Sequence, residues 1–416
     1  MKLGKFGRLS LAAVAAVALG LGMSACGGGT IGYMWVLGDT LNSAGQGQIA
    51  GFKIDDYTGN LTATVGSPYT SGGAFPVSLA VRPGGRYVYV VNAGSSTSAG
   101  DLAVFTVGGD GILTYQTSYT TQGGTPVWVS TDTAGNFVYV LDSLDPTNTA
   151  ANIANGTATG TGDITVFSVN SSTGRLTLVT NQQIKNPDGT QLTYFPVGKS
   201  PNTMRLGSGG CLLTLDQGDQ TIFPYSANSS TGQLTLTANS TVSLGTTNAT
   251  SLNVGGSYVF VTDAGTNQIV QYTVGSACAL STVVGGSVPN LGGTANPANA
   301  LYVPGSSSNN YLYVINQSNT NSTEVNSTIS AFTVTYTGQL QQVSDPKNNP
   351  YSVGSTPTCL VEDPSSKYLY TANNGDGTVT GKVINKSNGQ LANLPRGTNF
   401  SAVGKATCLA VTGSID

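Results

Sequence analysis

The chain has 416 residues, of which 56 are Gly, 17 are Pro and none is His, and 39% are apolar, enough to build a folded core. The absence of His excludes Ser-His-Asp and Cys-His catalysis and His-ligated zinc or iron sites. Lys and Arg number only 16 against 19 Asp and Glu, and the net charge is −3, so a basic surface for nucleic acid is excluded.

The N-terminus has the pattern of an export signal. Lys2, Lys5 and Arg8 precede an uncharged apolar run, residues 9–23, which is too short for a transmembrane helix. The run continues into Met-Ser-Ala-Cys26, which resembles the bacterial lipoprotein signal, where cleavage precedes a Cys that is then lipidated.

This pattern predicts a signal peptide at 1–25 and a lipidated Cys26 with a Gly-rich tether at 26–32. The protein would then be exported and anchored in the bacterial cell envelope, in the periplasm or at the outer membrane, with the lipid as its only membrane attachment. Ordinary secretion with an unmodified Cys26 is the alternative.

Seven copies of a short alternation of aromatic and aliphatic residues recur at an average spacing of about 56 residues. A second β-rich run follows each copy, and then a turn and a third run that begins Gly-x-Leu. Most copies are preceded by Gly-x-x-Pro and another short strand. The copies begin at Tyr33, Tyr87, Phe137, Cys211, Tyr258, Tyr311 and Tyr368. The turns lie at Gly59, Gly111, Gly174, Gly232, Gly338 and Gly389, with Cys278 in the equivalent place of the fifth copy.

Alternation with a period of two, β-branched and aromatic enrichment, and Gly, Asn and Asp turns predict a four-stranded antiparallel sheet for each unit, without helices. The first copy lacks its innermost strand, and the segment 404–411 closely matches 354–361, the segment that leads into the last copy. We therefore predict one all-β domain over 33–416, a seven-bladed β-propeller in which the C-terminal strand completes blade 1.

The aromatic residues of the repeat are predicted to fill the core between blades, because they recur in nearly every unit. A sugar-stacking platform is the functional alternative. Trp128, on an innermost strand near the axis, is the aromatic residue most suited to a ligand.

Short polar residues follow the aromatic strands and should form a ring on one face. Asp142, Asp216 and Asp263 would place three carboxylates on the rim of a central channel, where they are candidates to bind a cation, orient a polar ligand or act in catalysis. The structural alternative is that Asn and Asp start turns by bonding to nearby backbone. Neither the loop at 216–219 nor the loop at 373–377 has the ligand spacing of a calcium site. We expect no metal or cofactor.

Further candidates stand outside this ring. The loop from Asp142 to Asp163 is the longest, Glu324 lies in the corresponding loop of blade 6, and Arg205 lies in the innermost strand of blade 4, where it is a candidate to bind an anion. Cys359 and Cys408 occupy matching positions in adjacent blades, so they either bridge the closure or are small buried residues.

The repeat over 76–92, 102–107 and 111–113 resembles the seven-bladed lactonase-like propellers, a family that includes bacterial 6-phosphogluconolactonases. The tandem strands also resemble the YVTN-type repeats of bacterial surface propellers. The resemblance covers essentially the whole mature chain and implies a central site with Arg and His after the inner-strand Pro and Glu after an Asn. Here those places hold Val77-Ser78, Val127-Trp128, Asn202-Thr203, Thr358-Cys359 and Ala93, so no catalytic residue carries over.

Two functions remain as hypotheses. The first is a non-enzymatic envelope lipoprotein whose loop-bearing face binds a protein, a glycan or a small molecule. The second is a lactone hydrolase in which an Asp of raised pKa activates water and Arg205 or backbone N–H groups stabilise the oxyanion.

Overall fold

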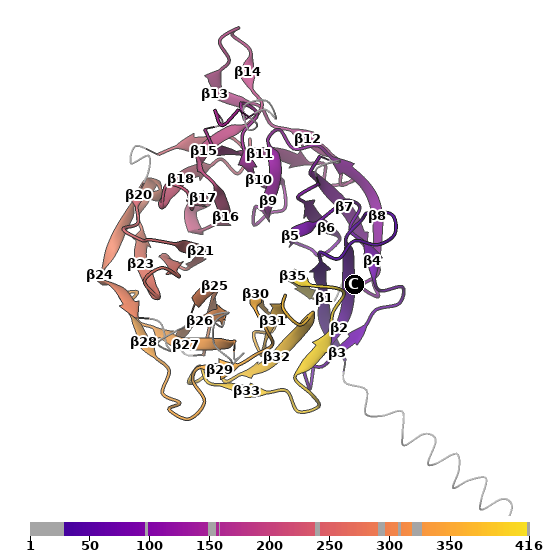
Figure 1. Ribbon diagram of the computed structural model, residues 1–416, viewed down its shortest axis with the longest axis vertical. Helices are drawn as coiled ribbons and strands as arrows, with labels where there is room; N and C mark the ends of the chain where they lie inside the picture. The colour runs from indigo at the N-terminus through magenta and orange to yellow at the C-terminus, as the bar shows by residue number, and fades with distance from the viewer. Residues whose placement is uncertain are drawn as a thin grey trace, which may run out of the picture.

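The computed structural model describes residues 29–95, 99–148, 155–157, 159–237, 242–289, 296–306, 309–317 and 327–413. Seven antiparallel sheets stand around a central axis, which confirms the seven-bladed propeller (Figure 1). The described residues hold two short 3₁₀ turns, η1 (Ser208–Gly210) and η2 (Ser276–Cys278), and no helix long and apolar enough to cross a membrane. The predicted signal peptide, Cys26 and Glu324 lie outside the described residues.

Each blade has four strands in order from the axis outward, as the repeat predicts. The innermost strands, from blade 1 to blade 7, are β35 (Ala406–Gly413), β5 (Pro76–Val81), β9 (Gly124–Thr131), β16 (Pro201–Leu206), β21 (Ala249–Gly255), β25 (Asn296–Pro304) and β30 (Pro357–Glu362). The second strands are β1 (Thr30–Gly38), β6 (Tyr87–Asn92), β10 (Phe137–Leu144), β17 (Cys211–Asp216), β22 (Tyr258–Asp263), β26 (Asn310–Gln317) and β31 (Tyr368–Asn373).

The outer half of each blade follows the same plan. The third strands are β2 (Gln48–Asp55), β7 (Asp101–Val107), β11 (Thr161–Val169), β18 (Thr221–Ala227), β23 (Gln268–Val274), β27 (Thr328–Val334) and β32 (Thr378–Ile384). The outermost strands are β3 (Leu61–Ala63), β8 (Leu113–Tyr119), β12 (Leu176–Leu178), β19 (Leu234–Leu236), β24 (Leu280–Pro289), β28 (Leu340–Gln342) and β33 (Leu391–Asn393).

Five blades carry a further short strand that pairs with their third strand. These strands are β4 (Tyr69–Thr70), β15 (Phe195–Lys199), β20 (Val242–Ser243), β29 (Tyr351–Ser352) and β34 (Asn399–Ser401). In blades 2 and 5 the outermost strand is instead long and continuous. A separate hairpin, β13 (Asn181–Lys185) with β14 (Gln191–Leu192), projects from blade 3 (Figure 1).

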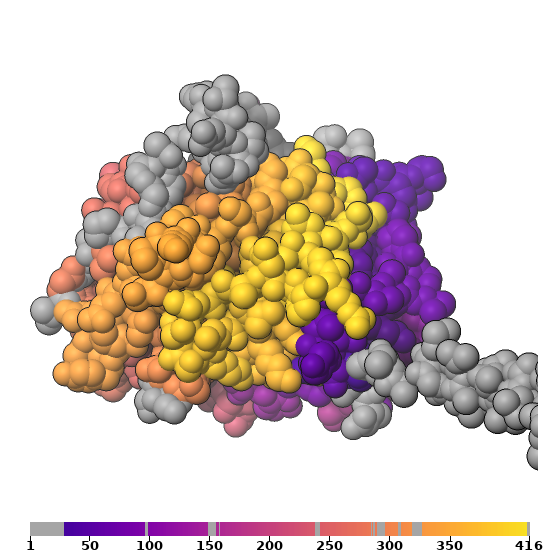
Figure 2. Space-filling model, turned by 90° about the horizontal axis from the view of Figure 1, so that it is seen from below, coloured from indigo at the N-terminus to yellow at the C-terminus, as the bar shows by residue number. Residues whose placement is uncertain are grey.

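The two ends of the chain close the ring in blade 1. β35 pairs with β1, and Trp35 lies opposite Ala410 in the antiparallel register. The C-terminal strands therefore lie directly beside the N-terminal ones (Figure 2). The pairing covers the inner edge of β1, which would otherwise expose unpaired backbone groups. β1 itself begins at Thr30, inside the segment predicted as a tether.

The core consists of the interfaces between blades, and its repeated contact joins a glycine to an aromatic ring. At six interfaces the turn before the outermost strand has a Gly with positive φ, which packs on the first ring of the preceding blade. A Cβ at Gly111, for example, would collide with the ring of Tyr33. At the seventh interface a disulfide between Cys278 and Cys211 takes the place of this pair.

Candidate functional site

A cavity of about 390 Å³ lies on the axis and is lined by residues from all seven innermost strands. Only two of its lining residues are charged, Arg205 and Glu362. A larger groove of about 690 Å³ lies on the outer face between blades 2 and 3. Its lining includes Tyr87 and Gly174, which form the glycine–ring contact found at five other blade interfaces. Nothing in that contact distinguishes this groove from the other interfaces. The axial cavity is therefore the better candidate.

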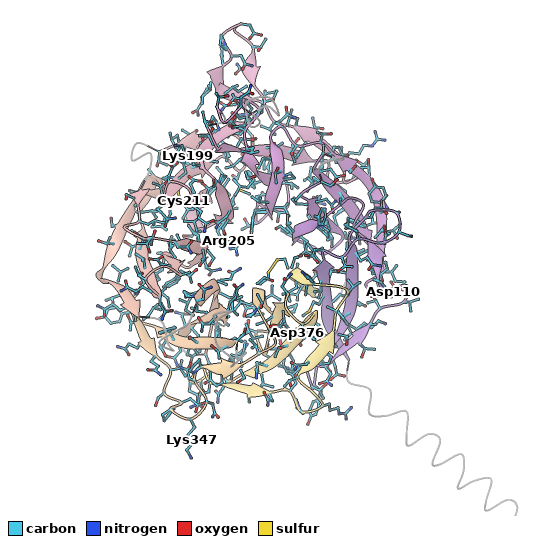
Figure 3. The ribbon with its side chains drawn as sticks, in the orientation of Figure 1. Asp110, Lys199, Arg205, Cys211, Lys347 and Asp376 are labelled. Carbon is cyan, nitrogen blue, oxygen red and sulfur yellow. A yellow bond between two sulfur atoms is a disulfide. The ribbon has the colours of Figure 1, made fainter. Side chains whose placement is uncertain are left out.

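Arg205 breaks the repeat at its position. It lies opposite Leu213 of the second strand, and the residues at the same register position in the other six blades are uncharged. These are Ala80, Ser130, Asn253, Leu301, Val361 and Ala410. In blade 4 the opposing residue is Leu213, where five of the other blades have Tyr or Phe and one has Trp. The side chain points toward the middle of the ring (Figure 3).

The Arg205 guanidinium lies over the indole of Trp128 from the neighbouring blade, with 4.1 Å between Cζ and the ring centroid. Its hydrogen bond goes from Nη1 to the Met204 carbonyl oxygen, at 3.3 Å. Among the described residues no carboxylate lies within ion-pair distance of it. Burial lowers the pKa of Arg205 to about 10, so the group stays a cation at neutral pH. The cavity thus holds a partly desolvated positive charge that no described anion neutralises.

Glu362 ends β30, across the ring from blade 4, and is the one carboxylate that lines the cavity. Its Oε2 is buried and has no hydrogen-bond partner among the described residues. Burial raises the pKa of Glu362, and the neighbouring Asp363 carboxylate adds to this effect. A buried carboxyl group with a raised pKa is a candidate for proton transfer in a reaction.

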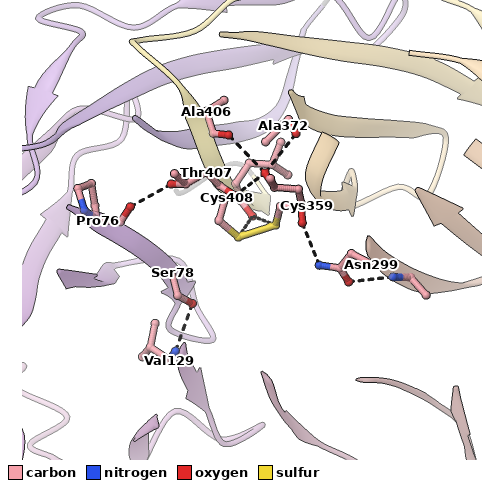
Figure 4. The surroundings of a disulfide bond; sticks show 12 residues. Pro76, Ser78, Val129, Asn299, Cys359, Ala372, Ala406, Thr407 and Cys408 are labelled. Atoms are coloured by element: carbon pink, nitrogen blue, oxygen red, sulfur yellow. Dashed lines mark hydrogen bonds between the residues drawn. A yellow bond between two sulfur atoms is a disulfide. The ribbon is translucent and has the colours of Figure 1, made fainter. Parts of the chain in front are cut away.

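Hydrogen bonds between side chains and backbone groups join the innermost strands around the axis (Figure 4). They cross six of the seven junctions. The bonds run from Thr407 to Pro76, Val129 to Ser78, Asn202 to Thr250, Thr250 to Pro297, Asn299 to Thr358 and Thr358 to Thr407. The remaining junction, between β9 and β16, has the stacked pair of Trp128 and Arg205.

Cys359 and Cys408 also line the cavity and are joined by a disulfide that links blade 7 to blade 1 (Figure 4). The second disulfide, Cys211–Cys278, has a Cα–Cα distance of 5.4 Å. Sequence reasoning left the pairing of these cysteines open.

The three predicted carboxylates lie at the other end of the innermost strands and do not line this cavity. Asp142 and Asp216 are opposite Pro126 and Pro201, which lie at or near the start of their innermost strands. From Pro201 to Arg205 a strand advances by about 13 Å. Asp142 and Asp216 are fully buried and Asp263 is 1% exposed. Each accepts hydrogen bonds from Thr hydroxyls or from backbone N–H groups of neighbouring turns.

The surroundings of the three carboxyl groups give them different pKa values. Burial raises the pKa of both Asp142 and Asp216 to about 7, although each accepts hydroxyl or backbone hydrogen bonds. Burial also acts on Asp263, but hydrogen bonds from Thr266 and from the backbone of residues 247, 248 and 265 outweigh it and lower its pKa. The described residues contain no group of three or more His, Cys, Asp or Glu that is arranged to hold a metal ion.

Asp142 and Asp163 differ from the prediction, which placed them at the two ends of a long loop. The strands β10 and β11 extend past them, and the two carboxylates face each other in register. Asp163 is fully buried, and neither of its side-chain oxygens has a hydrogen-bond partner among the described residues. Burial raises the pKa of Asp163, and the facing Asp142 carboxylate adds to this effect.

Sequence reasoning singled out Arg205 and Trp128, which the structure brings into contact, but it passed over Glu362. The available signal was its rarity, because only two Glu occur in the chain. Its place at the end of an innermost strand is the second clue.

The family described as "Lactonase, 7-bladed beta-propeller" matches residues 36–142 and 281–405. Similar solved structures include a putative 6-phosphogluconolactonase from Bacteroides fragilis, with 17% identity, a TM-score of 0.68 and coverage of 92% of this chain and 98% of that one.

Two further structures have the same fold. A protein from Lactobacillus plantarum has 18% identity and a TM-score of 0.68, with 92% and 99% of the two chains covered. The periplasmic gluconolactonase of Pseudomonas aeruginosa has 16% identity and a TM-score of 0.65, with the same coverage. No curated protein sequence matches this chain.

Proposed function

This chain belongs to the lactonase family of seven-bladed β-propellers, and we propose that it is an exported propeller that binds a ligand. Its axial cavity would take a small ligand that carries a carboxylate or a phosphate. The observation that carries the proposal is the Arg205 cation, stacked on Trp128 and without a described carboxylate at ion-pair distance.

The physical argument is one of unbalanced charge. Burying a guanidinium without a counter-charge costs folding free energy, and the six equivalent positions avoid that cost with uncharged residues. A planar guanidinium presents a fork of donors that matches the oxygens of a carboxylate or phosphate. The indole beside it offers a flat apolar surface for the body of the ligand, and the volume of about 390 Å³ suits a molecule of monosaccharide size.

The chain has two Trp, and one of them reports on this cavity directly. Trp35 is fully buried in the core, whereas Trp128 lines the cavity. We expect aldonates and sugar phosphates to change the fluorescence of the chain from residue 27 saturably, and W128F to remove that change. R205M should abolish binding.

The matched control is R82M, since Arg82 also lies over an aromatic ring, Tyr87, but outside the cavity. Equal binding by R205M and the wild type would contradict the proposal. So would loss of binding in R82M to the same extent as in R205M.

Glu362 supports a second candidate function, hydrolysis of lactones in the same cavity. The two neighbours named as putative 6-phosphogluconolactonase and periplasmic gluconolactonase indicate which lactones to test. Glu362, with its raised pKa, would accept the proton of a water that attacks the lactone carbonyl, and Arg205 would stabilise the oxyanion. The ring C–O bond would then break, and Glu362 would return the proton to the leaving ring oxygen, which gives the hydroxy acid. Asp142, Asp216 and Asp263 do not line the cavity, so the carboxylate in this mechanism is Glu362.

The two functions separate in one comparison. Titration at constant pH measures acid release from a panel of aldonolactones, with the buffer rate as the blank. If the protein is a hydrolase, E362Q loses turnover but keeps ligand binding, while R205M loses both. If it is a binding protein, no lactone is hydrolysed above the blank and E362Q binds as well as the wild type.

We also propose a lipid anchor on Cys26 in a bacterial envelope. The support is the charged start, the apolar run and the small residues before Cys26, together with two disulfides, which are typical of exported proteins. Labelled palmitate should be incorporated into the full chain and be absent from C26A. Equal labelling of both would contradict the anchor.

A further inference from the structure

A second departure from the repeat lies on the outer side of the ring, in blade 7. One position on the third strand is a buried aromatic residue in six blades. These residues are Phe52, Phe105, Phe167, Tyr225, Tyr272 and Phe332, each 6% exposed or less. In blade 7 the same register position holds Lys382, opposite Leu369 on one side and Asn393 on the other.

Lys382 is only 7% exposed, so most of its side chain is buried where the other blades place an aromatic ring. The Nζ atom donates one hydrogen bond, to Oδ1 of Asn393 at 2.7 Å. An ammonium group has three donors, and among the described residues no carboxylate lies within ion-pair distance of this one. Burial lowers the pKa of Lys382, and no neighbouring acid counteracts that effect.

This lysine opens into a groove of about 420 Å³ between blades 6 and 7. Blade 7 contributes β32 and β33. Blade 6 contributes β29, which includes Ser352, and the segment before β29, which carries Lys347. Figure 2 looks onto this outer side of the ring, and Lys347 projects outward from it in Figure 3. Asp345, in the same segment, is already bound by Asn348 and by the Tyr351 hydroxyl.

We propose that this groove is a second binding site, which takes an oxyanion, a carboxylate or phosphate group on a small molecule, at the Lys382 ammonium. The anion would supply the counter-charge that this buried cation lacks. It would also accept hydrogen bonds from the remaining N–H groups of the ammonium. Lys347 adds a second positive charge to the groove, and the amide of Asn393 and the hydroxyl of Ser352 offer further hydrogen bonds. This site is separate from the axial cavity, whose lining shares no residue with it.

The repeat supplies the test variant. K382F restores the residue type of the other blades, so it should fold at least as well as the wild type while removing the charge. The probes are inorganic phosphate and glucuronate, with sodium chloride at the same ionic strength as the blank. Binding is followed by calorimetry and by the ammonium signals of ¹⁵N-labelled lysine, in which the Lys382 signal is assigned from its absence in K382F.

We expect a saturable shift of the Lys382 signal with at least one probe, and an affinity about 10- to 100-fold weaker in K382F. K347Q should weaken binding less. K386Q is the matched control, because Lys386 also donates to a protein oxygen in blade 7, the Ser365 carbonyl, but does not line the groove. R205M should leave this site intact.

The proposal is wrong if K382F and the wild type bind both probes equally. It is also wrong if neither probe acts beyond the chloride blank, or if R205M alone removes the binding. Binding of phosphate without glucuronate would assign the site to phosphate esters, and the reverse result would assign it to carboxylates.

Discussion

Cys278 of blade 5 is bonded to Cys211 of blade 4 at the place where every other blade interface sets a turn glycine against an aromatic ring. Cys278 even keeps the positive φ of those glycines, +58°. Both positions therefore differ from those at the other interfaces, one on each blade, and a covalent bond stands in place of a packing contact.

The first prediction concerns this exchange. C211Y/C278G rebuilds the Tyr–Gly contact, so we expect it to fold and to recover much of the stability that each single change loses. C278G alone should cost about 2–4 kcal/mol, because it opens a disulfide that spans many residues. Urea unfolding in a C359S/C408S background measures the difference without the other disulfide. A double variant no more stable than C278G would show that the two contacts are not interchangeable.

The second prediction concerns the glycine turns. G111A should destabilise the protein by clearly more than about 1 kcal/mol, since the φ of +81° disfavours alanine and its Cβ would collide with the Tyr33 ring. G84A is the matched control, with a φ of +88° and open space around its Cβ. The difference in unfolding free energy between the two variants isolates the ring contact. Equal losses would mean that only the backbone matters.

The third prediction concerns the facing carboxylates Asp142 and Asp163. The equivalent pair in blade 2 is Asn92 and Asp101, and there the amide donates to the carboxylate at 2.7 Å. D142N should copy that bond, so the Asp163 carboxylate would face an amide donor in place of a second carboxyl group. We expect the variant to be more stable than the wild type above pH 7, with a smaller gain toward pH 4.

The sign follows from linkage. Asp142 keeps its proton to about pH 7 in the folded state, whereas an unfolded Asp loses it near pH 4. Stability therefore falls as the pH rises between these values, by up to about 1.4 kcal/mol per pH unit for each such proton. Asp216 acts in the same window in both proteins, so the slope in D142N should shrink without vanishing. Urea midpoints across this range decide the matter, and parallel curves would show that Asp142 does not titrate in this window.

The fourth prediction separates stability from binding at Arg205. Since its guanidinium is partly desolvated without a described counter-ion, R205M should stabilise the unliganded protein by roughly 0.5–2 kcal/mol while it removes ligand binding. Thermal unfolding with and without ligand measures both effects. A destabilised R205M would mean that the stack on Trp128 contributes more than the buried charge costs.

The blade count could be predicted because the signal is local and repeated. Each four-stranded unit shows a period of two, and the turn glycines and aromatic residues recur once in each unit, so one weak copy does not obscure the pattern. Closure was predictable too, since the segment 404–411 matches an innermost strand that the first copy lacks. The structure confirms it in the pairing of β35 with β1.

The candidate sites depend on contacts that no single repeat contains. Trp128 and Arg205 are 77 positions apart and meet because consecutive blades stand side by side around an axis. Asp142 and Asp163 face each other because two strands run on where the sequence predicts a loop. Lys382 stands out only when the register equates it with six buried aromatic residues.

The sequence by itself therefore determined the propeller, the number of blades and the way the ring closes, because strand alternation and turn chemistry act over a few residues. Which side chains meet at the axis, which carboxylates lose their water and which lysine is buried was decided by the tertiary structure. Those properties follow from the register between strands and from the packing of one blade on the next, and desolvation exists only once that packing is formed.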